Sequence, residues 1–205
     1  MSRYEIDTTD AQYEPGSNGL VLKNKLGITE PIDIDDVESE LLLKLYQKLF
    51  IDSNPLSVLS FSDVLSWHRQ WLGNVYEWAG KIRSANIGKG NFQFASSSLL
   101  DGLIDDFESE YLQRFNVLDQ MTREELVQYI AASHVEFILI HPVREGNGRL
   151  SRLLIDIISQ KAGFGLLDYS LWDENKDYYF KSIQAGVDRD YQYIARLVRD
   201  VLPTN

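Results

Sequence analysis

The chain has 205 residues, with 20 Lys plus Arg against 31 Asp plus Glu, so its formal net charge is −11 with histidine neutral. Because binding to a phosphate backbone needs a clustered surplus of basic residues, this charge argues against nucleic acid as the main partner. The hydrophobic fraction of 44% is typical of a globular domain, and no stretch resembles a membrane span or signal peptide. The absence of cysteine excludes disulfides, thiolate metal sites and cysteine nucleophiles, and it is compatible with a cytoplasmic location.

The first part of the chain is predicted to be an irregular arm followed by helices. Residues 1–31 are polar and rich in glycine and proline, which is typical of irregular structure. Apolar residues then recur at helical spacing, and Asn54-Pro55 is expected to break the pattern. The helices predicted in this part cover residues 33–50, 60–72 and 75–81.

Residues 82–94 have a different pattern, in which two glycines flank Lys89 and alternating apolar and polar residues follow. This pattern predicts a β-hairpin, and it is the only convincing strand signal in the chain.

Helical patterns resume after the hairpin. Thr122 and Glu125 have the spacing of a capping box, which marks the start of one helix. The helices predicted in this part cover residues 98–115, 122–140, 150–161, 170–184 and 188–202. We therefore expect an all-α bundle with one hairpin, in which residues 1–55 form an arm and a helix that pack on a core domain of residues 56–205.

The segment from His141 to Arg152 contains the groups that a phosphate-binding site needs. Gly146 and Gly148 allow positive φ and close approach of the backbone to a ligand, so that successive N–H groups can form an anion-binding nest. The helix that follows directs its positive end to the same place. Arg149 and Arg152 lie three residues apart, on one face of that helix, where two guanidinium groups can bind a polyphosphate.

Two further residues of this segment indicate catalysis. Bare phosphates would repel Glu145, so its presence suggests a bridging Mg²⁺, which is usually held by one or two carboxylates together with phosphate oxygens. His141 ends the preceding predicted helix, and its unperturbed pKa suits removal of a proton from a hydroxyl at neutral pH.

The same segment resembles the signature of the Fic family, His-Pro-Phe-x-x-(Asp/Glu)-Gly-Asn-Gly-Arg-x-x-Arg, and departs from it only at Val143, where the family has phenylalanine. The resemblance extends to residues 75–83, to the hairpin around Lys89, and to the arm at residues 15–18 and 22–27. It implies a Fic-type helical bundle whose hairpin is the flap of the family. A core residue is expected at Val143, with activity retained.

The resemblance implies transfer of AMP from ATP to a Tyr, Thr or Ser hydroxyl of a target protein, with release of pyrophosphate. It implies that His141 is the catalytic base and that Glu145 holds Mg²⁺. The residues implied to bind the phosphates of ATP are Gly146, Asn147, Gly148, Arg149 (β-phosphate) and Arg152 (γ-phosphate). The residues implied to position the target and nucleotide are Lys89, Gly90, Asn91 and Phe92, with the target segment added as a strand.

Many members of the family are inhibited by a helix of pattern (Ser/Thr)-x-x-x-Glu-(Gly/Asn), whose glutamate pairs with the second motif arginine. The only match is residues 170–175, at the start of a predicted core helix, so we interpret it as a chance match. The resemblance then implies a bacterial toxin that a small, separately encoded antitoxin protein inhibits.

Several alternatives remain open. The chain could be a kinase of the Doc branch, a transferase of UTP or another nucleotide, or a binding module that only senses nucleotide. Gly148 argues against the Doc branch, and His141 with Glu145 argues against pure binding. We expect His68 and His134 to be packed or capping groups, and Asp156 to be a surface charge.

Overall fold

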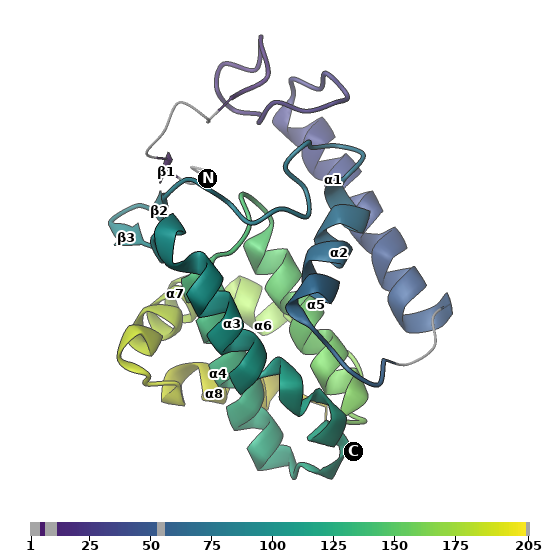
Figure 1. The fold of residues 1–205 in the computed structure, drawn as a ribbon, viewed down its shortest axis with the longest axis vertical. Coiled ribbons are helices and arrows are strands. Elements are labelled where there is room, and N and C mark those ends of the chain that lie inside the picture. The colour runs from purple at the N-terminus through teal and green to yellow at the C-terminus, as the bar shows by residue number, and fades with distance from the viewer. Residues whose placement is uncertain (1–4, 7–11, 53–55, 204–205) are drawn as a thin grey trace. The chain divides into compact units, whose positions relative to one another are not determined.

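The computed structural model describes residues 5–6, 12–52 and 56–203. Helices dominate it, with one small sheet (Figure 1). Within the described residues the contacts form two compact units. The first comprises the described residues within 1–55, 62–100 and 142–145, and the second comprises those within 56–61, 101–141 and 146–205. The expected division into an arm and helix at residues 1–55 and a core domain at residues 56–205 is a different kind of division from these contact-based units. It stays a prediction. The expected break at Asn54-Pro55 lies outside the described residues.

The first unit contains one whole helix and all but the first residue of a second, both of which the sequence predicts. Helix α1 spans Pro31–Gln47 and ends in a π-helical turn, Lys48–Asp52, and helix α2 spans Phe61–Leu72. Glu38 of α1 is fully buried and accepts the hydroxyl of Tyr76, while its backbone carbonyl accepts the indole N–H of Trp71 at 2.8 Å. Burying a carboxylate this deeply requires such partners.

The predicted helix at residues 75–81 is wrong, because this segment forms successive turns. The carbonyl of Val75 accepts the N–H of Lys25 at 2.8 Å, and the N–H of Gly80 donates to the His68 ring at 2.9 Å. Both groups would bond within the segment if it were a helix. Tertiary contacts therefore override the local pattern here.

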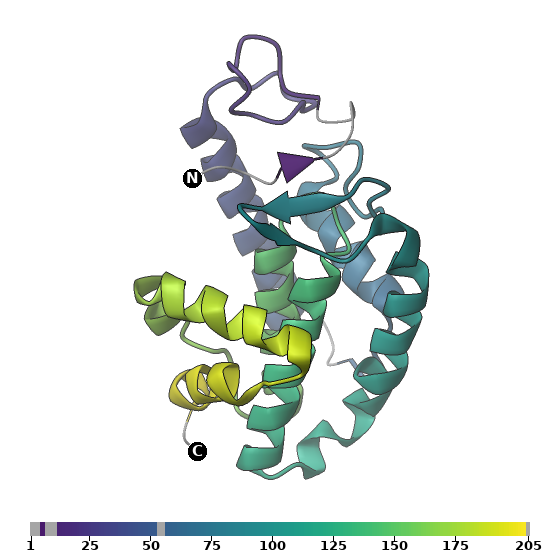
Figure 2. The same ribbon diagram turned by 90° about the vertical axis from the view of Figure 1, so that its left-hand side faces the viewer.

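The sheet of the first unit has three antiparallel strands in the order β1-β2-β3. Strands β2 (Ile87–Lys89) and β3 (Phe92–Gln93) form the predicted hairpin, which confirms an all-helical fold with one hairpin. Strand β1 (Glu5–Ile6) was not predicted, and it pairs with the outer edge of β2, residue 5 opposite Gly88 (Figure 2). Two residues are too short for any period-2 signal.

Helix α3 (Leu100–Glu110) follows a 3₁₀ turn at Ser97–Leu99, and all of it after Leu100 belongs to the second unit. A 3₁₀ helix, Leu112–Gln120, comes next, so the single helix predicted at 98–115 is wrong after residue 110. Helix α4 (Arg123–Ile140) starts with the predicted capping box, in which Thr122 and Glu125 bond each other's backbone N–H groups.

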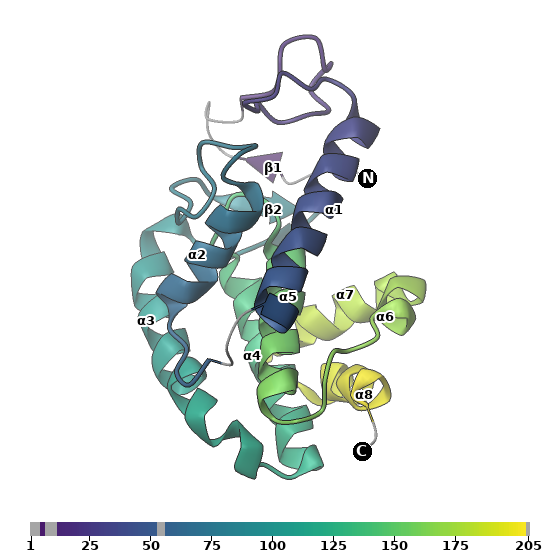
Figure 3. The ribbon, with the colours of Figure 1, turned by 90° about the vertical axis from the view of Figure 1, so that its right-hand side faces the viewer.

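Helix α5 (Asn147–Lys161) begins three residues before its predicted start and packs against α4. The predicted helix 170–184 is two helices, α6 (Ser170–Glu174) and α7 (Lys176–Ala185), with Asn175 between them at φ −112° and ψ 44°. Helix α8 (Gln192–Val201) starts four residues later than predicted. These C-terminal helices gather beside α4 and α5 (Figure 3). No helix in the described ranges is long and apolar enough to cross a membrane.

Candidate active site

The motif segment joins α4 to α5 through two residues with left-handed backbone. His141 closes α4 at φ 52° and ψ 58°, and Gly146 precedes α5 at φ 83° and ψ 5°. The first α5 bond runs from the N–H of Leu150 to the carbonyl of Gly146 at 2.8 Å. The N–H groups of Asn147 and Gly148 thus lie in the first turn, where a helix offers donors and positive potential to an anion.

The His141 ring has a defined tautomer. Its Nδ1 lies 3.1 Å from the carbonyl oxygen of Ile138, one turn back in α4. A carbonyl only accepts, so Nδ1 carries the hydrogen, and in the neutral ring Nε2 carries the lone pair. The side chain is 2% exposed, so the ring is held by its surroundings. A neutral imidazole with its lone pair on Nε2 is the form that can take a proton.

The four residues between the two bends, 142–145, belong to the first unit. The carbonyl of Pro142 accepts the N–H of Arg83 at 2.9 Å, and the carbonyl of Glu145 lies 3.1 Å from Nε2 of His68. Val143 is fully buried, as expected for the core position of this loop. The valine therefore occupies the core position that phenylalanine has in the family, and its side chain is not exposed.

Arg152 is held by an acidic and two aromatic side chains. Its guanidinium donates to both carboxylate oxygens of Asp173, at 2.9 and 3.2 Å. It also lies 4.8 Å from the ring centroid of Tyr169 and 5.9 Å from that of Trp172. Burial favours the neutral form, but the hydrogen bond and charge of Asp173 raise the pKa of Arg152 above its usual value. Arg149 is half-buried on the same helix.

A series of hydrogen bonds between buried side chains connects α5 to α4 and α7. Nδ1 of His134 lies 2.7 Å from the Ser151 hydroxyl, and Nε2 lies 2.8 Å from the Tyr179 hydroxyl. Burial, and secondarily the charge of Arg152, lowers the pKa of His134 to about 3. The ring is therefore neutral at physiological pH, and its expected packing role is confirmed.

Asp156 corrects an expectation, because it is 2% exposed instead of being a surface charge. Its carboxylate accepts the N–H of Leu167 at 3.0 Å and the hydroxyl of Tyr169 at 2.9 Å. It therefore fixes the chain after α5 and orients the Tyr169 ring on which Arg152 stacks. Burying a charged carboxylate in an apolar part of the protein costs free energy unless it accepts hydrogen bonds, and these donors provide them for Asp156.

The hairpin is fastened at its base by Arg83. The guanidinium donates to the carbonyls of Ala85 and Ala95, both at 2.6 Å, so it ties together the two chain segments that enter and leave the hairpin. Arg83 is 5% exposed, and burial lowers its pKa to about 10. The predicted flap residues 89–92 lie at the hairpin tip, where Gly90 has φ 58°.

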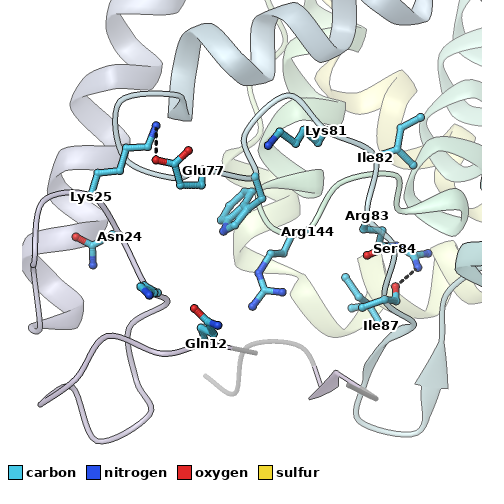
Figure 4. Close-up of a pocket in the computed structure, with 13 residues that line it drawn as sticks. Gln12, Asn24, Lys25, Glu77, Lys81, Ile82, Arg83, Ser84, Ile87 and Arg144 are labelled. Atoms are coloured by element: carbon cyan, nitrogen blue, oxygen red, sulfur yellow. Dashed lines mark hydrogen bonds and ion pairs between the residues drawn. The ribbon is translucent and has the colours of Figure 1, made fainter. Parts of the chain in front are cut away.

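A cavity of about 530 Å³ lies in the first unit (Figure 4). Arg144 of the motif segment points into it, and Ile87 of β2 also lines it. The lining contains five Lys or Arg residues and one carboxylate, that of Glu77, which pairs with Lys25 at 3.3 Å. This local charge is opposite to the net charge of the chain.

The structure thus holds the predicted site residues in two groups. His141 and residues 146–152 belong to the second unit, whereas Glu145 and the flap residues 89–92 belong to the first. Among the described residues no cluster of three acidic or histidine side chains could hold a metal. Sequence reasoning missed the contacts of His68 with the motif segment, since its partners are 12 and 77 residues away.

A family model described as "Fic/DOC family" matches residues 58–159. A probable protein adenylyltransferase, y4lH, of Sinorhizobium fredii is 26% identical over 81% of this chain and 83% of its own length. The protein adenylyltransferase VbhT of Bartonella schoenbuchensis is 30% identical over 80% of this chain and 33% of its own length.

Solved structures have the same fold. The BepC protein of Bartonella tribocorum, with bound AMPPNP, has a TM-score of 0.75 at 21% identity and covers 95% of this chain and 97% of its own. A Fic domain of a Bartonella effector protein reaches 0.79 at 18% identity, covering 98% and 95%. By its motif, its fold and these relatives, the chain belongs to the Fic/DOC family.

Proposed function

We propose that this protein is an adenylyltransferase that moves AMP from ATP to a Tyr, Thr or Ser hydroxyl of a target protein. The observation that carries the proposal is the tautomer of His141, whose Nδ1 hydrogen is directed at Ile138 so that Nε2 can act as a base. A nucleotide sensor has no need of such a base. Relatives over most of the chain are named adenylyltransferases, which supports the same activity.

The phosphates of ATP are proposed to bind along the start of α5. The N–H groups after Gly146 receive the α-phosphate with Asn147, Arg149 binds the β-phosphate, and Arg152 binds the γ-phosphate. The left-handed Gly146 and the helix start support this placement, because both direct backbone N–H groups outward from one turn.

Glu145 is the residue proposed to hold Mg²⁺, together with phosphate oxygens of ATP. The chemistry of the side chain fits this ion, because Mg²⁺ is usually held by one or two carboxylates together with substrate phosphate oxygens. The ion would neutralise charge on the phosphates.

In the proposed reaction, His141 Nε2 takes the hydroxyl proton as the target oxygen bonds to the α-phosphorus. The bond from the α-phosphorus to the bridging oxygen breaks, and pyrophosphate leaves with its electron pair. Arg149 and Arg152 stabilise the charge that develops on the leaving group. The products are an AMP ester of the target and pyrophosphate, and the proton returns from His141 to solvent.

The target segment is proposed to dock on the flap by strand addition. An added strand needs a free sheet edge, and the outer edge of β2 is already paired with β1. A target strand must therefore replace β1 or pair with the other edge, at β3. Lys89, Gly90, Asn91 and Phe92 of the tip are proposed to position it.

We also propose that a small antitoxin protein inhibits the enzyme in the cytoplasm. The match to the inhibitory pattern, residues 170–175, belongs to helices packed in the second unit, where Trp172 is fully buried. The carboxylate on Arg152 is that of Asp173, whereas Glu174 is exposed. This packing supports an inhibitor supplied by another chain.

The test is incubation with labelled ATP, Mg²⁺ and a bacterial lysate, followed by detection of labelled proteins. The wild type is expected to label at least one protein, and His141→Ala is expected to abolish the labelling. Equal labelling by the variant would contradict the proposal. ATP binding by calorimetry without any labelled product would favour the nucleotide-sensing alternative.

A further inference from the structure

His68 connects helix α2 to two other segments of the first unit. It is fully buried, its Nδ1 accepts the N–H of Gly80 at 2.9 Å, and its Nε2 lies 3.1 Å from the carbonyl oxygen of Glu145. The ring stacks on Trp78 at 5.8 Å and meets the edge of Trp71 at 6.0 Å. Both the position and the orientation of the imidazole are therefore fixed.

The partners also fix its protonation. Because Gly80 N–H is a donor, Nδ1 of His68 must carry the lone pair, and the ring hydrogen lies on Nε2. Nε2–H then donates to the carbonyl of Glu145, which can only accept. The neutral tautomer with its hydrogen on Nε2 therefore forms both hydrogen bonds, to Gly80 and to Glu145, at once.

Gly80 gives this arrangement a rigid support. It has φ +77°, and a Cβ at this position would lie 2.5 Å from Cβ of Arg69 and 3.1 Å from the carbonyl oxygen of Leu65. The backbone at residue 80 therefore packs directly on α2. Since Nδ1 of His68 is bonded to this backbone, Nε2 has little freedom to move away from Glu145.

We infer that His68 is a positioning residue for the proposed Mg²⁺ ligand Glu145. The carbonyl of Glu145 shares a planar peptide group with the N–H of Gly146, so one hydrogen bond sets the orientation of that whole group. It thus fixes both the backbone that carries the carboxylate and the first N–H of the proposed phosphate site. The inference rests on the proposed function, and residues outside the ligand set of a metal commonly have this role.

Two conservative variants separate the two hydrogen bonds. His68→Gln places an amide N–H near the position of Nε2 and keeps a donor for Glu145. His68→Asn places a carbonyl oxygen near the position of Nδ1 and keeps only the acceptor for Gly80. His68→Leu removes both bonds. The inference requires the glutamine variant to behave like wild type and the asparagine variant to behave like leucine.

The first measurement is amide hydrogen exchange of the full chain without nucleotide or metal. His68→Asn and His68→Leu are expected to speed exchange at residues 145–147 about tenfold, with His68→Gln within about twofold of wild type. The second is calorimetric binding of a non-hydrolysable ATP analogue at increasing Mg²⁺. The Mg²⁺ concentration for half-maximal binding is expected to rise about tenfold in the first two variants only.

Val64→Ala is the matched control, because Val64 is a fully buried residue of the same helix without a role in the site. It should lower stability without moving either measurement. The inference would be overturned if His68→Asn exchanged at the wild-type rate. It would also be overturned if His68→Gln, at similar stability, had a defect equal to that of His68→Leu. If wild-type protein binds the analogue independently of Mg²⁺, the proposed Mg²⁺ role of Glu145 fails, and the exchange result alone decides whether His68 orients the segment.

Discussion

Arg152 and Asp173 form a two-point ion pair, with guanidinium nitrogens 2.9 and 3.2 Å from the two carboxylate oxygens. The pair joins α5 to α6. Arg152 is also the residue proposed to bind the γ-phosphate. Its hydrogen bond lowers the pKa of Asp173, so the carboxylate stays charged at neutral pH. A bound γ-phosphate would therefore meet a guanidinium whose charge is partly offset.

Asp173→Asn is expected to strengthen ATP binding about threefold to fivefold, because the offsetting charge is removed, a change of about 1 kcal/mol. AMP binding should stay unchanged, since AMP has no γ-phosphate. Calorimetry with both nucleotides checks this. Weaker ATP binding would show instead that Asp173 mainly holds Arg152 in position. Asp168→Asn is a control, because Asp168 accepts hydrogen bonds from Ser170 at the start of α6 and not from Arg152.

Acid should destabilise the protein through His134. Its pKa is about 3 in the folded chain, below the ordinary 6.5, so the unfolded chain binds more protons between these pH values. Stability should therefore be complete above pH 6.5 and fall as the pH decreases. From pH 7.5 to 5.0 this one group contributes a loss of about 2 kcal/mol.

Urea unfolding at the two pH values, for wild type and His134→Gln, measures this effect. The variant is less stable at neutral pH because Ser151 and Tyr179 lose their partner, but it should lack this part of the acid sensitivity. An identical loss of stability in both proteins would contradict the account.

Arg83→Met should loosen the flap. It leaves the carbonyls of Ala85 and Ala95 without the guanidinium and should lower the free energy of unfolding by about 2 to 3 kcal/mol. Labelling of the target should fall more than ATP binding, because the flap is proposed to hold the target. Lys81→Met, at an exposed neighbouring basic residue, is the control. Equal losses in binding and labelling would contradict a role specific to the flap.

Much of this arrangement follows from local sequence, and some does not. The capping box at Thr122 and the glycines around Lys89 act within a few residues, so helix α4 and the hairpin were predicted. The turns at residues 75–81 depend on Lys25 and His68, which lie far away in the sequence, and local periodicity carries no trace of them. Strand β1 is similar, because only its pairing with β2 makes it a strand.

The motif itself was the clearest signal for the site, because its residues are adjacent in the chain. Burial of the residues that support it was harder to predict. The sequence predicts a surface charge at Asp156, yet the residue is buried, and its donors from Leu167 and Tyr169 compensate the burial. The pairing of Arg152 with Asp173 likewise depends on how α6 packs.

Ile6→Pro tests whether β1 competes with the target. Proline removes a backbone N–H and disfavours pairing in the sheet, so the edge of β2 should become available. Labelling of the target is expected to increase severalfold, with Ile6→Val as the control. Unchanged or reduced labelling would show that the target does not use this edge of the flap.

The fate of the two ends of ATP tests the central claim most directly. Parallel reactions with ATP labelled at the α-phosphate and at the γ-phosphate are analysed for label in protein and in pyrophosphate. An adenylyltransferase puts the α label on the target and releases the γ label in pyrophosphate, and His141→Ala does neither. Transfer of the γ label to protein would contradict the account and identify a kinase.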